Sequence, residues 1–206
     1  MARDRGSIVK MSRREGYALH PKAHKALVKR TGMPGQVTTG RNSRNKPSQY
    51  ALQLREKQKV KRLYGLLEKQ FSNLMKEADR AQGQSGEILL RFLEQRLDNA
   101  IYRAGFAPSR RGARQLVSHG HFMLNDRRVD IPSIRLKATD VISLRPKSQL
   151  NSYFKSIDDT SPAPSEVPSW LQVNRKKFET KVSGLPMRDD AEPDINEQLI
   201  VEYYSR

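Results

Sequence analysis

The feature that most limits what this chain can fold into is its strongly basic beginning. Residues 1–62 contain 17 Lys or Arg against only 3 Asp or Glu. Glycines and prolines are spread along the first 47 residues and interrupt any regular helix or strand pattern there. Such a segment buries too little apolar surface to offset the conformational entropy that ordering removes. We therefore expect residues 1–47 to form an extended basic arm, with a short helix near 22–30, that becomes ordered on an anionic partner.

The rest of the chain is less basic. Residues 63–155 carry a net charge of +7 and residues 156–206 a net charge of −4, which brings the 206-residue protein to +17. A field of this sign favours polyanions, and nucleic acid is the leading candidate. Acidic residues near the end of the chain would repel phosphate, so we do not expect all three parts to contact the same partner.

The sequence also restricts location and chemistry. No apolar run approaches the ~18 residues of a membrane-spanning helix, and no lipidation motif is present, so no membrane partner is expected. The start, MARDRGSIVKMSRREG, lacks the apolar core of a signal peptide. The chain has no cysteine, which excludes disulfides and thiolate zinc sites and agrees with a reducing cytosol.

The spacing of apolar residues predicts helices followed by a small sheet. The expected helices cover residues 49–80, 87–104 and 110–119. Ser48 and Ser109 are suitable N-caps for the first and third. Alternating apolar residues over 121–134 and 140–145 predict an antiparallel sheet. After it come a proline-rich linker at 158–169, an apolar anchor at Trp170 and Leu171, and a buried last element.

Residues 109–121, SRRGARQLVSHGH, predict a helix without a single acidic side chain. Its apolar side consists of Ala113, Leu116 and Val117. Its surface side is expected to hold Arg110, Arg111, Arg114 and Ser118. Like charges on one helix repel, and the planar fork of arginine binds phosphate through two parallel hydrogen bonds. Because few aromatic residues lie among these bases, the segment favours reading folded RNA by shape and phosphate over stacking on single strands.

Two further segments extend this prediction. The turn that follows residue 124 brings Asn125, Arg127 and Arg128 near the basic helix. Upstream, the stretch LREKQKVKR (54–62) contains five bases around a single acid, Glu56. Joined to the basic arm, this stretch indicates phosphate contact, with a solvated helix face as the alternative.

The long segment LEQRLDNAIYRAGFAPSRRGARQLVSHGHFMLNDRRVDIPS (93–133) resembles the signature of bacterial small-subunit ribosomal protein number four. Shorter segments resemble the same family in the expected order over nearly the whole chain. They are SRREG (12–16), PGQ (34–36), QLREKQKVKRLYG (53–65), TDVISLR (139–145) and DINEQLIVEYYS (194–205). A single motif is weak evidence, because several enzyme families share this RNA-binding module, but the ordered set is specific.

The resemblance implies an α+β fold with three parts. After the extended basic arm (1–47) comes a mostly helical domain, residues 48–92 and 156–206. Into it is inserted an RNA-binding module of helices plus a small antiparallel sheet, residues 93–155. The resemblance further implies a structural constituent of the small ribosomal subunit, located in the cytoplasm within the ribosome. Such a protein binds small-subunit ribosomal RNA, nucleates assembly of the subunit body, and contributes to the messenger entrance and to translational accuracy.

The expected site residues fall into three sets. Those expected to bind ribosomal RNA are Arg13, Arg14, Arg55, Lys57, Lys59, Arg62, Ser109, Arg110, Arg111, Arg114, Gln115, Ser118, His119, Asn125, Arg127 and Arg128. By the family pattern, those that face messenger RNA are Arg41, Arg44 and Lys46. Those expected to face a neighbouring basic protein are Asp189, Asp190 and Glu192. Ribosomal protein number five is the implied neighbour there, with number three as a further partner; the alternative is that these acids are solvated or neutralise the chain's own basic helix.

The sequence lacks the motifs of other functions that share this module. Uridine-isomerising enzymes and some aminoacyl-tRNA synthetases carry the same module, but this chain has no phosphate-binding glycine motif and no nucleophile–His–acid set, so no enzyme and no cofactor are expected. Many relatives bind zinc through four cysteines that are absent here. The pairs His20/His24 and His119/His121 lack further ligands, so no metal site is expected. A free-standing repressor of its own messenger remains open, because one basic surface serves either role.

Overall fold

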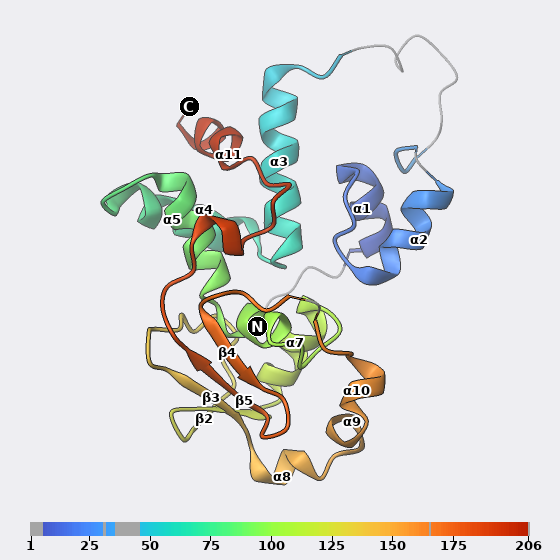
Figure 1. Cartoon of the computed structure of the whole chain (residues 1–206). Coiled ribbons are helices and arrows are strands. Elements are labelled where there is room, and N and C mark those ends of the chain that lie inside the picture. Colours follow the sequence, from blue (N-terminus) through green and yellow to red (C-terminus); the bar gives the residue numbers. More distant parts are fainter. Residues whose placement is uncertain (1–5, 31, 36–45, 165, 206) are drawn as a thin grey trace. The chain divides into compact units, whose positions relative to one another are not determined.

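The computed structural model covers the whole chain and describes every residue except 1–5, 31, 36–45, 165 and 206 (Figure 1). Helices and one antiparallel sheet make up the described part, which confirms the α+β fold. The chain forms two compact units, the first from Met1–Ile88 with Asp194–Arg206 and the second from Leu89–Pro193. No helix among the described residues has the length and apolar character needed to cross a bilayer.

The first unit is helical. Its helices are α1 (Ile8–Glu15), α2 (Pro21–Lys29), α3 (Gln49–Leu63), α4 (Glu68–Arg80) and α11 (Glu197–Tyr204). The C-terminal helix α11 packs against α3. There Tyr50 stacks on Tyr203 with ring centroids 5.8 Å apart, and Gln53 Nε2 donates to Glu202 Oε2 at 2.8 Å. Helices α1 and α2 lie in the predicted arm, whose described part is therefore folded rather than extended.

The predicted single helix over 49–80 is wrong, because the chain turns between α3 and α4. Gly65 adopts a left-handed conformation with φ 66°. Its N–H donates to the Arg62 carbonyl at 3.1 Å, and the Leu66 N–H donates to the Lys61 carbonyl at 2.9 Å. This pair of bonds is a Schellman-type helix end, which glycine adopts without a steric penalty. The apolar pattern hides the break, because buried leucines lie on both sides of it.

The predicted helix over 87–104 is also divided, into α5 (Ser85–Glu94) and α6 (Leu97–Arg103). Between them the backbone pairs with a distant segment instead of continuing the helix. The Leu97 N–H donates to the Ile134 carbonyl at 2.9 Å, and the Leu136 N–H donates to the Gln95 carbonyl at 2.9 Å. These long-range bonds satisfy the backbone groups that the interrupted helix leaves free.

The second unit carries the sheet. Its strands are β1 (Phe122–Leu124), β2 (Arg127–Val129), β3 (Val141–Leu144), β4 (Leu171–Asn174) and β5 (Glu179–Val182). The order across the sheet is β2-β1-β3-β5-β4, with antiparallel neighbours throughout. Helices α7 (Arg110–Ser118), α8 (Pro146–Gln149), α9 (Ser152–Lys155) and α10 (Ile157–Thr160) complete it.

Strands β4 and β5 were not predicted, and they change the expected domain boundaries. Residues 156–193 belong to the unit that contains the sheet, not to the helical unit in which the sequence had placed residues 156–206. The reason is that β5 pairs along β3, with Ile142 opposite Thr180. The sequence did not reveal β4 and β5 because each is only four residues long. Their apolar residues alternate with polar ones, so the apolar pattern of each strand is weak.

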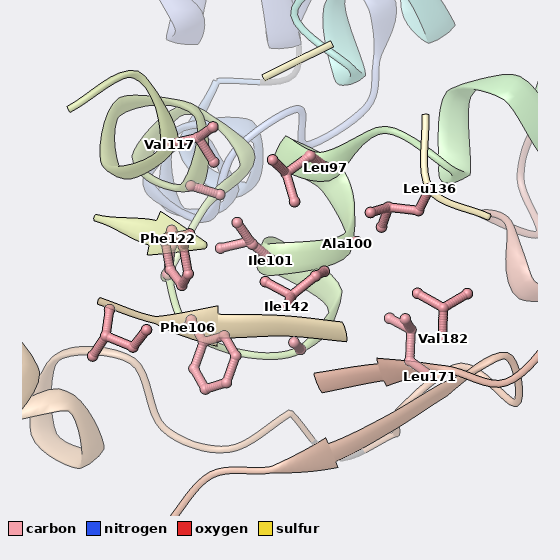
Figure 2. Close-up of a cluster of buried hydrophobic side chains, with 14 of the residues drawn as sticks. Leu97, Ala100, Ile101, Phe106, Val117, Phe122, Leu136, Ile142, Leu171 and Val182 are labelled. Carbon is pink, nitrogen blue, oxygen red and sulfur yellow. The ribbon is translucent and has the colours of Figure 1, made fainter. Parts of the chain in front are cut away.

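One apolar core joins the helices of the second unit to its sheet (Figure 2). Leu97 and Ile101 of α6 meet Val117 of α7 on the helical side, and Phe122 and Ile142 come from the sheet. All five side chains are buried. Full burial of such residues contributes roughly 1.5–3 kcal/mol each, so α7 is fixed firmly against the strands.

Candidate nucleic-acid interface

Helix α7 is built as the sequence predicts. Ser109 Oγ accepts a hydrogen bond from the Gly112 N–H at 3.2 Å, which caps the N-terminus. Ala113 and Val117 face the core and are fully buried. At the other end Gly120 has φ 70°, and its N–H donates to the Val117 carbonyl at 2.7 Å. The Ser109 hydroxyl thus acts as an acceptor in the cap, and its contact to RNA stays a prediction.

The opposite side of α7 is exposed and basic. Arg111, Gln115, Ser118 and His119 are all exposed to solvent. Their spacing of four, three and one residues places them along one stripe of the helix. Strand β2 of the β1–β2 hairpin adds Arg127 and Arg128, which are also exposed. We refer to these six residues as the basic surface.

The hairpin and the helix meet at Gly120. A Cβ at this position would lie 2.7 Å from Arg128 Nε and 2.8 Å from its Nη2. The guanidinium of Arg128 therefore lies directly against the end of α7, in space that only a glycine leaves open. Because of this contact, the exposed stripe of α7 and the hairpin form one continuous surface.

The cations of the basic surface have no acidic partner within the described part of the chain. The ion pairs that are formed there involve other side chains. Arg111, Arg127 and Arg128 are thus available to an external anion. A planar guanidinium suits phosphate, because it donates two parallel hydrogen bonds to it.

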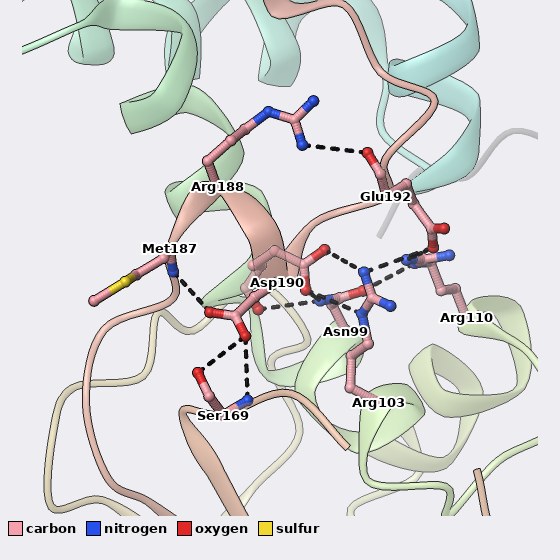
Figure 3. Close-up of polar contacts among 9 residues, drawn as sticks. Asn99, Arg103, Arg110, Ser169, Met187, Arg188, Asp190 and Glu192 are labelled. Carbon is pink, nitrogen blue, oxygen red and sulfur yellow. Dashed lines mark hydrogen bonds and ion pairs between the residues drawn. The ribbon is translucent and has the colours of Figure 1, made fainter. Parts of the chain in front are cut away.

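Two arginines of α7 depart from the prediction. Arg114 is only 9% exposed, so it does not lie on the surface side of the helix as expected. Arg110 donates from Nε to Asn99 Oδ1 and from Nη2 to Glu192 Oε1, both at 2.9 Å (Figure 3). Its guanidinium also lies 4.6 Å from the ring centre of Tyr102. Arg110 is therefore bonded within its own unit and Arg114 is buried, and the assignment of both to RNA stays a prediction.

Asn125 also has a structural task. With Asp126 it forms the two-residue turn of the hairpin, at φ 48° and 63°, as type I′ turns require. Its side chain accepts the Val141 N–H at 2.9 Å and donates to Asp140 at 2.8 Å. These bonds fix the hairpin to β3, so the amide that was predicted to contact RNA is occupied.

The five bases of the basic stretch of α3 pair with three acids, two of which lie outside α3. Arg55 and Arg62 both pair with Glu15 of α1, whose side chain is fully buried. Lys57 is itself buried and lies 2.7 Å from Glu68, which Lys61 also contacts at 2.8 Å. Lys59 pairs with Glu56 at 3.1 Å. The prediction counted only Glu56, so it overestimated the charge available to RNA.

The two distant carboxylates titrate differently. Burial raises the pKa of Glu15, and the nearby Arg55 and Arg62 only partly oppose this effect. Partial burial would also raise the pKa of Glu68, but hydrogen bonds from Lys57, Lys61 and Tyr204 lower it to about 2. Glu68 is thus fully charged at neutral pH and forms the centre of a polar cluster that joins α3, α4 and α11.

The remaining predicted residues lie in the N-terminal segment. Arg13 donates from Nη2 to the Gly32 carbonyl at 2.8 Å, and Arg14 is exposed. Lys46 is exposed as well. Arg41 and Arg44 lie outside the residues that the structure describes.

The three acids predicted to face another protein differ in their contacts (Figure 3). Asp190 accepts hydrogen bonds from the Ser169 N–H at 3.1 Å and the Met187 N–H at 2.8 Å. Glu192 pairs with Arg110 at 2.9 Å and lies 3.6 Å from Arg103. Glu192 therefore neutralises Arg110 of the chain's own basic helix, which was the alternative to a protein contact. Asp190 holds the backbone of Ser169 and Met187 within the same unit. Asp189 is exposed.

Comparison with known proteins agrees with this geometry. Residues 3–94 match the family described as Ribosomal protein S4/S9 N-terminal domain, and residues 95–142 match the S4 domain. The chain is 50% identical to a protein of Chlorobium phaeovibrioides over 206 residues, the full length of both. It is 49% identical to one of Chloroherpeton thalassium and 47% identical to one of Roseiflexus sp., again over the full length of each chain. All three are named small ribosomal subunit protein uS4.

The chain belongs to the uS4 family. This confirms the resemblance that the sequence motifs suggested, and the family consists of ribosomal proteins rather than enzymes. The basic surface lies wholly within the segment that matches the S4 domain. The compact unit of this uS4 chain continues beyond that match to residue 193 and takes in β4 and β5.

Proposed function

We propose that the chain is a structural constituent of the small ribosomal subunit and binds its RNA directly through the basic surface. The observation that carries this proposal is the group of exposed arginines, Arg111, Arg127 and Arg128, which have no acidic partner among the described residues. They lie on a helix and hairpin that a shared core holds rigidly, so RNA binding removes little conformational freedom from the backbone. As a member of the uS4 family, the protein acts in the ribosome and therefore in the cytoplasm.

The chemistry favours phosphate and shape over base recognition. The basic surface contains arginines, an amide, a hydroxyl and one imidazole, but no phenyl, phenol or indole ring on which bases stack. Folded RNA displays phosphates and 2′-hydroxyls across a wide minor groove, and these groups match such donors. We therefore propose a structured region of small-subunit RNA as the ligand.

The direct test uses the full-length protein and small-subunit ribosomal RNA. Arg111→Gln combined with Arg127→Gln removes two charges from the basic surface. The control, Lys155→Gln with Lys176→Gln, removes two charges from exposed positions elsewhere in the same unit. Filter binding at several salt concentrations is expected to show weaker affinity and a shallower salt dependence for the first variant only. Equal losses in both variants would refute the assignment of this surface.

The finer roles of the protein belong to this proposal too. Nucleation of the subunit body would follow from one rigid unit that binds RNA before other proteins do. Arg41, Arg44 and Lys46 would face messenger RNA at its entrance, as the family pattern implies. Omitting the protein from reconstitution of the small subunit is expected to block assembly of the body, and charge removal at the three messenger-facing residues to impair initiation on structured messengers.

We propose a protein contact at Asp189 that contributes to translational accuracy, with small-subunit proteins number five and number three as neighbours. Asp189 is exposed, and Leu185 and Met187, which are close to it in sequence, are 51% and 72% exposed. Exposed apolar residues within a few positions of an exposed acid suit a small interface with a basic protein. Asp189→Lys is expected to raise misreading while RNA binding stays unchanged. Wild-type error rates in ribosomes that contain the variant would exclude this role.

A further inference from the structure

Strand β4 forms one open edge of the sheet in the second unit (Figure 1). It pairs with β5 on one side, with Val173 opposite Thr180, and no described strand pairs with its other side. The opposite edge of the sheet is β2, which carries Arg127 and Arg128 of the basic surface. The open edge of β4 therefore lies at the far end of the sheet from that surface.

The backbone of Val173 is directed towards this open edge. Directly after β5, the Ser183 N–H donates to the Trp170 carbonyl at 2.9 Å. Bonding alternates along an antiparallel strand, so Leu171 and Val173 direct their N–H and C=O groups away from β5. The Leu171 N–H agrees with this direction, because it donates to the Pro168 carbonyl at 3.0 Å. For the N–H and C=O of Val173, no described residue is a partner.

A groove of about 240 Å³ lies along the β4–β5 hairpin. Apart from Val173, its lining consists of two amides, two lysines and one carboxylate: Gln172, Asn174, Lys177, Lys181 and Glu179. Both lysines are exposed. Neither they nor Glu179 form an ion pair with any described residue. The groove therefore has a net positive charge beside the unpaired backbone groups of β4.

We propose that the open edge of β4 binds an extended acidic segment of another protein, which adds to the sheet as a further strand. A residue of that segment opposite Val173 bonds to both its N–H and its C=O, and such backbone bonds give affinity for a strand added to an edge. Acidic side chains at alternate positions of the segment fall on one face, where Lys177 and Lys181 neutralise them. The inference goes beyond the proposed function, because it involves neither the basic surface nor Asp189.

The charge of the hairpin favours this partner over two others. A second copy of the chain would bring the same lysines to the edge, and like charges opposite one another across strands are destabilising. RNA phosphate suits the lysines, but it has no donor for the carbonyls of Leu171 and Val173, and Glu179 repels it. An acidic peptide supplies both N–H donors and carboxylates.

The test measures the fluorescence anisotropy of a labelled, end-capped hexapeptide of alternating glutamate and valine with the full-length protein, at ~0.1 M salt to screen distant charges. Val173→Pro removes only the outward N–H of the edge, which is where a sheet tolerates proline. It is expected to bind the peptide about two- to tenfold more weakly, the effect of one or two backbone hydrogen bonds. Val173→Thr keeps the N–H and is expected to match the wild type.

A second pair of variants tests the charge of the groove. Lys177→Gln with Lys181→Gln is expected to weaken peptide binding, whereas Lys147→Gln with Lys155→Gln removes the same charge from exposed positions of the same unit and leaves binding unchanged. Equal peptide affinity of the two variants would overturn the inference. Small-subunit RNA that binds the first variant more weakly than the second would assign the hairpin to RNA and overturn it as well.

A modified peptide tests the same backbone bonds on the unaltered protein. Methylation of alternate backbone nitrogens keeps the charge of the hexapeptide but prevents it from pairing with an edge. The wild-type protein is expected to bind this peptide more weakly than the unmodified one, and equal affinity would exclude strand addition. Circular dichroism verifies that Val173→Pro is folded; if it is not, the comparison of the two peptides decides.

Discussion

Helices α3 and α7 are both rich in bases, yet their charges have different partners. The bases of α3 pair with Glu15, Glu56 and Glu68, and its Lys57 is buried. The bases on the outer side of α7 and on the adjacent hairpin are exposed and lack acidic partners in the described chain. The comparison teaches that a run of bases does not by itself mark an RNA-binding surface. The decisive question is whether the fold supplies the opposite charge.

The largest expected effect on stability comes from breaking an ion pair of α3. Arg62→Ala leaves the buried carboxylate of Glu15 with Arg55 as its remaining arginine partner. Removing one partner of a buried ion pair is strongly destabilising, and with Arg55 still present we expect a loss of about 2–4 kcal/mol in the free energy of unfolding. Urea denaturation measures this loss. Arg14→Ala is the control, because Arg14 is exposed and adjacent to Glu15. Unchanged stability with reduced RNA affinity would reverse the assignment of α3.

The next largest effect is expected when unpaired arginines of the basic surface are removed. Arg111→Ala with Arg127→Ala removes two exposed cations that touch no acid. We expect stability to stay within about 0.5 kcal/mol of the wild type. The slope of log affinity against log salt should fall by about 1.4–1.8, since each of the two phosphate contacts contributes about 0.7–0.9. A variant that unfolds at lower urea concentration but keeps its salt dependence would contradict the distinction between the two helices.

A smaller effect is expected where α7 meets the hairpin. Gly120→Ala places a methyl group 2.7 Å from Arg128 Nε at a residue with φ 70°. The backbone strain lowers stability by about 1 kcal/mol, and the displaced guanidinium should weaken RNA binding modestly. Gly184→Ala in the same unit is the matched control, because its Cβ would meet nothing within 4 Å. If both variants bind RNA like the wild type, the position of Arg128 does not matter for binding.

The smallest effect is a pH dependence. The pKa of Glu68 is lowered to about 2, so its charged form stabilises the fold above the ordinary carboxyl pKa of 4.5, and this contribution disappears as the pH falls towards 2. Because Glu68 is 48% exposed, solvent limits the effect to less than about 1 kcal/mol. Stability differences between the wild type and Glu68→Gln, measured from pH 7 down to acid, should shrink accordingly.

Glu15 is expected to contribute a pH dependence of stability opposite in sign to that of Glu68. Its pKa is raised by burial, so its contribution is greatest below the ordinary carboxyl pKa and is lost as the pH rises through the raised value. Glu15→Gln should therefore differ from the wild type with a pH dependence opposite to that of Glu68→Gln. The same trend in both variants would mean that the two carboxylates do not titrate as their surroundings require.

Local signals in the sequence predicted α7 well. Its N-cap, its apolar side and the glycine at its end lie within twelve residues of one another, from Ser109 to Gly120. The hairpin turn was equally visible in Asn125, Arg127 and Arg128. These features depend on neighbours in the chain, so spacing alone reveals them.

Long-range features were missed for a physical reason. Arg62 and Glu15 are 47 residues apart, and Arg110 and Glu192 are 82 residues apart. No local sequence pattern predicts pairs this far apart in the chain, so Arg62 and Arg110 were assigned to RNA. Strands β4 and β5 were missed because their short alternating segments become strands only by pairing with β3. Exposure was thus predictable where it follows from one helix, and not where it depends on the whole fold.

The order of the sheet has a consequence for the protein during its own synthesis. Strand β3 ends at Leu144, and its neighbour β5 begins at Glu179, 35 residues later (179 − 144). A ribosome that adds about 5–20 residues per second needs about 2–7 s for that segment. During this time the growing chain already contains α7 and the hairpin, but one edge of β3 lacks its partner. Newly made protein therefore completes the sheet behind its basic surface only after β5 has been translated.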